Sequence, residues 1–134
     1  MNEGKGALAD DSVDPYIRAA FGMKSQDVVV LNVGDLTSIA DAFIICSGRS
    51  SRQVSAIAEH IEVELKRQKI RPLSVEGKKE GQWALLDYGH VVIHVFHEPV
   101  REIFDLEGLW IEAERLKPEI PNVAGETDKR SMPQ

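Results

Sequence analysis

Cysteine is almost absent from this sequence, because Cys46 is the only one among 134 residues. A single cysteine excludes a disulfide framework and any metal site built from several cysteines. Long hydrophobic runs are also missing: no apolar stretch approaches the roughly 20 residues that span a bilayer. The first residues, MNEGKGALADDSVD, are acidic and resemble neither a signal peptide nor an Arg-rich transit peptide. We therefore expect a cytoplasmic protein with no membrane association.

Positive charge is in deficit as well. There are 16 Lys and Arg against 22 Asp and Glu, so the formal net charge is −6 at neutral pH. Nucleic-acid binders need clustered Lys and Arg to contact phosphates, so direct sequence-specific binding of nucleic acid is not expected. An acidic domain is better suited to a basic protein partner.

The length and the 43% hydrophobic content predict one domain with a working core. Residues 1–12 hold glycines and acids without a periodic apolar face, which predicts a flexible N-terminus. The segment 118–134 combines three prolines with charge and has little to bury, which predicts a disordered tail. The expected domain therefore covers 13–117.

Hydrophobic periodicity and breakers predict the elements inside this domain. In chain order they are a helix over 14–21, strands over 27–33 and 41–48, a helix over 51–68 capped by Ser50 or Ser51, strands over 72–77, 83–88 and 90–96, and a helical stretch over 100–116 that Gly108 bends or divides. The fold class is α/β or α+β: a mixed β-sheet of about five strands flanked by helices.

The expected hairpin over 83–96 carries the most information about function. A two-residue turn at Tyr88-Gly89 would pair Asp87 with His90, Leu85 with Val92 and Trp83 with His94. Alternation then separates an aliphatic face from a face of mixed aromatic and polar character. The mixed face consists of Trp83, Leu85, Asp87, His90, Val92, His94 and Phe96. Such a mixture is typical of interface centres, although Trp83 and Phe96 could equally lie in the core under another helix.

The residues offer no metal site and no catalytic site. On a strand, His90 and His94 are about 13 Å apart, too far to share an ion. Cys46 lies in an expected buried strand, a poor setting for a reactive thiolate. The carboxylate pairs Glu62/Glu64 and Glu112/Glu114 fall on expected helices, where such neighbours diverge. We therefore expect no enzyme activity, no metal and no cofactor.

One turn could contact an anion. The sequence CSGRSSRQ places Ser50 and Arg52 at the start of the helix over 51–68, where backbone N–H groups attract negative charge. It lacks the second glycine and the lysine of a P-loop. The alternative interpretation is a helix cap with a solvated arginine.

Four motifs occur together: S-x-R entering this helix, E-G before the hairpin, W-x-x-x-D-x-G-x-V-x-x-H along it, and R-x-x-x-x-L-E-x-L-W after it. In this combination the sequence over about 27–110 resembles the ribosomal silencing factor family, also called Iojap-like proteins. Phe104 stands where a Tyr is common in that family, and Gly108 replaces a typical helix former. The segment from Pro118 lies outside the resemblance.

The resemblance implies a fold similar to nucleotidyltransferases without their catalytic site. It also implies binding to the large ribosomal subunit through ribosomal protein fourteen, on the face that meets the small subunit. Members block subunit joining and so repress translation when nutrients are short. The mixed hairpin face would make this contact. Two other hypotheses stay open: a nucleotidyltransferase-like nucleotide-binding enzyme, and a homodimer whose hairpin face is self-complementary.

Overall fold

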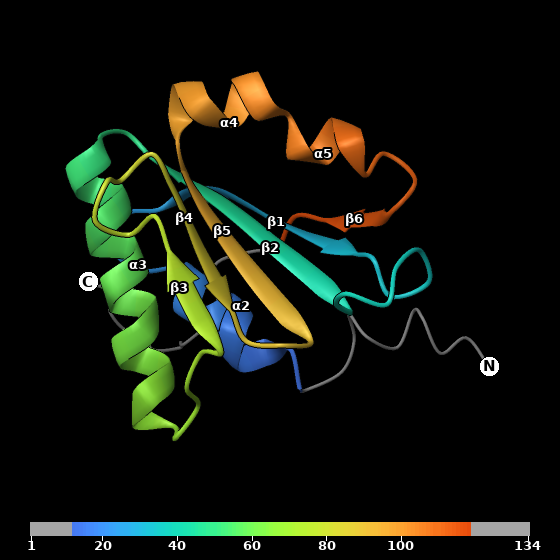
Figure 1. Cartoon of the computed structure of the whole chain (residues 1–134), viewed down its shortest axis with the longest axis horizontal. Coiled ribbons are helices and arrows are strands. Elements are labelled where there is room, and N and C mark those ends of the chain that lie inside the picture. Colours follow the sequence, from blue (N-terminus) through green and yellow to red (C-terminus); the bar gives the residue numbers. More distant parts are fainter. Residues whose placement is uncertain (1–11, 119–134) are drawn as a thin grey trace, which may run out of the picture.

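The computed structural model describes residues 12–118, in which helices cover both faces of one sheet (Figure 1). The predicted flexible ends, 1–12 and 118–134, fall almost entirely outside the described residues. In chain order the elements are α2 (Asp14–Ala20), β1 (Gln26–Asn32), β2 (Ala42–Gly48), α3 (Ser51–Arg67), β3 (Ser74–Glu76), β4 (Trp83–Asp87), β5 (Val91–His97), α4 (Glu98–Phe104), α5 (Leu106–Leu109) and β6 (Glu114–Leu116).

The sheet has six strands in the order β3-β4-β5-β2-β1-β6. The central pair β2–β5 is parallel, and the other four pairs are antiparallel. The predicted mixed sheet flanked by helices is therefore confirmed, with one strand more than the five expected. The added strand, β6, lies at the edge beside β1.

Each face of the sheet has its own hydrophobic core. On one face, α2 and α3 pack on the sheet, and the buried α3 positions are Val54, Ile57, Ala58, Ile61 and Leu65, as the helical spacing predicts. On the other face, Leu106 and the partly buried Val100 and Trp110 cover Phe43 and Phe96. Strands β1 and β2 are consequently almost wholly buried.

The hairpin register differs from the prediction. Leu85 pairs with His94 and Trp83 with Phe96. The Tyr88 N–H donates to the Val91 carbonyl at 2.9 Å, so the two-residue turn is Gly89-His90 and not Tyr88-Gly89. Gly89 has φ +94°, and glycine at the first central position is the preference of a type II′ turn. The shift moves every partner by two residues, so the strand residues stay on the expected faces.

The last part of the described chain also differs from the prediction. The helical stretch breaks at Asp105, whose φ is +46°, and not at Gly108. The Asp105 side chain accepts a hydrogen bond from the Gly108 N–H at 3.2 Å, which caps the short α5. The chain then turns and forms β6, so residues 114–116 are a strand and not helix, and Glu114 lies on that strand.

Candidate partner-binding face

The mixed hairpin face is largely covered by α4 and α5. Val92, His94 and Phe96 are buried beneath these helices, whereas Trp83, Leu85 and Asp87 are half-buried. The alternative that Trp83 and Phe96 lie in the core under another helix is therefore correct for Phe96 and partly correct for Trp83. Only the half-buried side chains can meet a partner directly, and their role in binding stays a prediction.

His90 does not join this face. As the second residue of the turn, it packs its ring edge-on against Tyr16 of α2, with ring centroids 5.3 Å apart. Tyr16 belongs to the core on the opposite side of the sheet. The expectation that His90 shares a face with Trp83 is therefore wrong, because a turn residue does not follow the alternation of the strand.

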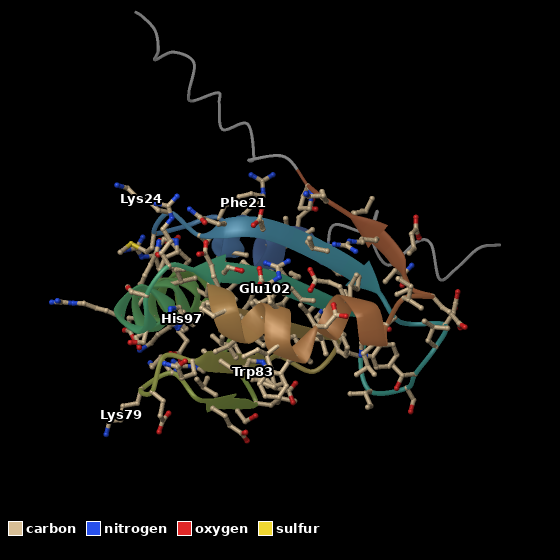
Figure 2. The ribbon with its side chains drawn as sticks, turned by 90° about the horizontal axis from the view of Figure 1, so that it is seen from above. Phe21, Lys24, Lys79, Trp83, His97 and Glu102 are labelled. Carbon is tan, nitrogen blue, oxygen red and sulfur yellow. The ribbon has the colours of Figure 1, made fainter. Side chains whose placement is uncertain are left out.

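Trp83 is held in place from two sides. Its indole N–H donates to Nδ1 of His94 at 3.1 Å. Its ring contacts Phe96 beneath it and Phe104 of α4, with centroid distances of 4.8 and 4.9 Å. Trp83 lies next to α4 in Figure 2. The core thus fixes the orientation of the indole, and on its outer side the indole contacts the exposed Phe104.

His94 is a neutral ring in this arrangement. Because Nδ1 accepts a hydrogen bond from Trp83, the ring proton resides on Nε2, which is buried without a partner among the described residues. Burial lowers the pKa of His94 from 6.5 to about 4. The ring also packs edge-on against Phe43, with centroids 5.2 Å apart. Its role is to position Trp83.

Sequence reasoning missed the outer surface of α4 and α5. Four large apolar side chains are exposed on these helices and on the turn that follows α5: Ile103 (76%), Phe104 (55%), Leu109 (74%) and Ile111 (72%). One signal could have revealed them. The stretch 103–111 contains more large apolar residues than a helix with one buried face can cover. We call these four residues together with Trp83 the apolar platform.

The platform is embedded in negative charge. Residues 98–114 contain six acids and one base, Arg101, and Glu102 is labelled on α4 in Figure 2. Arg101 does not offset the acids around the platform, because its guanidinium lies inward, only 11% exposed. There it pairs with Glu107 at 2.6 Å and donates to Ser47 Oγ at 2.8 Å. Burial acts to raise the pKa of Glu107, but Arg101 outweighs it and holds that pKa below its usual value.

A groove of about 820 Å³ lies between the helices α4 and α5 and the strands β1 and β6. The Arg101–Glu107 pair lines it, and a third Arg101 hydrogen bond reaches the Asp27 carbonyl at 3.0 Å. Arg101 therefore ties both short helices to the sheet. The pair has a structural role, because Nε, Nη1 and Nη2 of Arg101 all donate hydrogen bonds to groups within the chain.

Part of the anion site expected at the start of α3 is occupied by contacts within the chain. Ser50 Oγ accepts from the Gln53 N–H at 3.1 Å, so Ser50, one of the two predicted candidates, is the helix cap. A Cβ at Gly81 would stand 2.2 Å from the Ser51 carbonyl oxygen, so the loop before β4 packs closely against this helix end. Arg52 is exposed. Anion binding there stays a prediction.

The other sequence-level expectations concern chemistry. Cys46 is completely buried, and burial raises the pKa of its thiol to about 12, as expected for an unreactive cysteine. Within residues 12–118, no three His, Cys, Asp or Glu side chains are grouped closely enough to hold a metal ion. No helix in this range has the length and apolar character needed to cross a bilayer.

Comparison with known proteins adds direct relationships. The family model described as "Ribosomal silencing factor during starvation" matches residues 7–134, a wider range than the 27–110 of the resemblance. A ribosomal silencing factor from Halalkalibacterium halodurans is 40% identical over 97 residues, which cover 72% of this chain and 83% of that protein. The chloroplastic protein Iojap of Arabidopsis thaliana is 32% identical over 100 residues, or 75% of this chain and 42% of that protein. A crystal structure from Chromobacterium violaceum superposes with a TM-score of 0.72 at 31% identity, covering 90% of this chain and 97% of that one.

Proposed function

Because this chain belongs to the ribosomal silencing factor family, we propose that it binds the large ribosomal subunit through ribosomal protein fourteen and keeps the small subunit from joining. The apolar platform carries this proposal. An exposed aromatic ring, Phe104, that contacts a rigidly held tryptophan is typical of a binding hot spot. The surrounding acids suit a basic ribosomal protein and would steer its approach.

The proposed mechanism is occupancy and not catalysis. Bound at the joining surface, one copy of this chain excludes the small subunit by its bulk, and no chemical step is needed. Inhibition then saturates near one copy per large subunit. Since occupancy and joining exclude each other, excess small subunit must also displace the protein. The consequence in a cytoplasm short of nutrients is reduced translation.

The test is a sucrose-gradient profile of separated subunits mixed with rising amounts of protein. We expect fewer whole ribosomes and co-migration of the protein with the large subunit. The double variant Ile103→Ala/Phe104→Ala should lose binding, because truncation of interface aromatics often costs about 2 kcal/mol or more. Leu73→Ala is the matched control, since Leu73 is 75% exposed and lies before β3, away from the platform. Equal loss in both variants, or none in either, would contradict the proposal.

A second copy of this chain is the competing occupant of the platform. Concentration-dependent sedimentation separates the two possibilities. If the chain dimerises and Ile103→Ala/Phe104→Ala abolishes the dimer while leaving subunit binding intact, the platform serves self-association. Inhibition well below one copy per large subunit would instead indicate an enzyme.

A further inference from the structure

A second charged surface lies at the end of α3. Four of the six residues in 66–71 are basic, namely Lys66, Arg67, Lys69 and Arg71, and none is acidic. All four are exposed. In Figure 1 this end of α3 and the acidic helices α4 and α5 lie at opposite ends of the domain. A chain with a net charge of −6 therefore concentrates positive charge at one place, which we call the basic end.

The charges of the basic end are mostly available. Within residues 12–118 the only ion pair they make joins Arg67 to Glu64, at 3.1 Å and at the surface. The nearby acids Glu59 and Glu62 are occupied by Lys78, at 2.8 and 2.5 Å. Surface pairs of this kind contribute little and leave the field of the cluster largely intact.

The backbone at Lys69 allows the effect of its charge to be tested separately from the stability of the fold. Lys69 has φ +66°, and its N–H donates to the Lys66 carbonyl while the Ile70 N–H donates to the Leu65 carbonyl. This is a Schellman helix end, whose left-handed position strongly favours glycine. A lysine there is held in a conformation that is unfavourable for it. Replacing Lys69 by glycine would relieve this strain while removing one positive charge, so stability and charge can be separated at this position.

The basic end also borders a hollow. A groove of about 400 Å³ runs between α3 and the segment that follows it, and Lys66, Arg71 and Lys78 contribute to its walls. Its lining also includes Glu59 and Glu62, which both pair with Lys78 and are thereby offset in part. Lysines and arginines that line such an edge are the groups that contact a phosphate backbone.

We propose that the basic end of α3 contacts the phosphate backbone of the large-subunit RNA, independently of its sequence. The inference rests on the proposed function for the identity of the RNA. An acidic surface for a basic protein and a basic surface for RNA would together make a two-point attachment. The apolar platform and the basic end would contact the subunit at two separate places, because the 17 residues of α3 extend about 25 Å and keep these surfaces apart.

The test compares two variants of the full chain that each remove two positive charges. Lys69→Gln/Arg71→Gln removes two of the four positive charges of the basic end, and Lys24→Gln/Lys79→Gln is the control, with both lysines exposed and labelled in Figure 2. Binding to purified large subunits is measured between about 50 and 200 mM salt. We expect the first variant to bind several-fold more weakly, and its salt dependence to fall by about 1 to 2 in the log–log slope. The control should change neither quantity appreciably.

Two further measurements show whether weaker binding comes from a lost RNA contact, from a lost protein contact or from a change in stability. Binding to isolated ribosomal protein fourteen should be the same for both variants. Lys69→Gly should raise the melting temperature, because glycine fits the left-handed backbone, and yet weaken large-subunit binding. Two results would overturn the RNA contact while leaving the proposed function standing. One is an equal salt slope for the two variants. The other is a basic-end variant that loses as much binding to the isolated ribosomal protein as to the large subunit. If the unmodified chain fails to bind large subunits at all, both proposals fail.

Discussion

Protonation of His94 should destabilise this protein on mild acidification. The pKa of His94 is 6.5 when unfolded and about 4 in the fold. Between these values the unfolded chain binds more protons than the folded one, so the free energy of unfolding must fall as the pH falls. The contribution is complete above pH 6.5 and is lost progressively down to pH 4.

The magnitude follows from the size of the shift. Each pKa unit corresponds to about 1.4 kcal/mol, so the full effect is about 3 kcal/mol and about 2 kcal/mol is lost by pH 5. That is a large fraction of the roughly 5–15 kcal/mol that stabilises a typical domain. Glu107 does not interfere, because its pKa is lowered and its contribution is lost only at more acidic pH.

Urea unfolding at pH 5, 6, 7 and 8 measures the effect, with His94→Asn as the reference. The asparagine oxygen can replace Nδ1 as the acceptor for the Trp83 indole, but the side chain does not titrate. We expect the unmodified protein to lose about 2 kcal/mol more than the variant between pH 7 and pH 5. Parallel pH profiles for the two proteins would refute the burial of a neutral His94.

Three substitutions test other parts of the structure by thermal or urea unfolding. Arg101→Ala should destabilise by about 3 kcal/mol, because it leaves the largely buried Glu107 with only its longer pair to Arg115, at 3.6 Å; a loss below about 1 kcal/mol would show that the Arg101–Glu107 pair is solvated. Gly77→Ala should be at least as damaging, since φ is +77° and the new Cβ would stand 2.0 Å from the Trp83 carbonyl oxygen; a folded variant of normal stability would contradict this close approach. Ser50→Ala should cost about 1 kcal/mol through loss of the α3 cap, whereas Ser50→Asp should restore most of it.

Much of the fold is determined locally and was therefore accessible from sequence. Helix α3 follows from the spacing of its five buried aliphatic residues and from the Ser50 cap. The faces of β4 and β5 follow from strict alternation, and they survive even though the register moved by two residues. The family motifs could likewise be found from the sequence alone, because each is a pattern of residue types within one short segment.

Tertiary structure decided where each face goes. Sequence alternation grouped Trp83 with Phe96 and His94, but only the packing of α4 and α5 shows that Phe96 and His94 are buried and that Trp83 continues into Phe104. The spacing favoured a helical stretch over 100–116 that Gly108 bends or divides, whereas the structure breaks it at Asp105 and ends it in β6. The reason is long-range: residues 114–116 form backbone hydrogen bonds with β1, some 80 positions earlier in the chain. Local periodicity contains no information about such a partner. The surface that we propose for binding depends on these long-range contacts, because the β6 pairing, Arg101 and Leu106 hold the segment against the sheet.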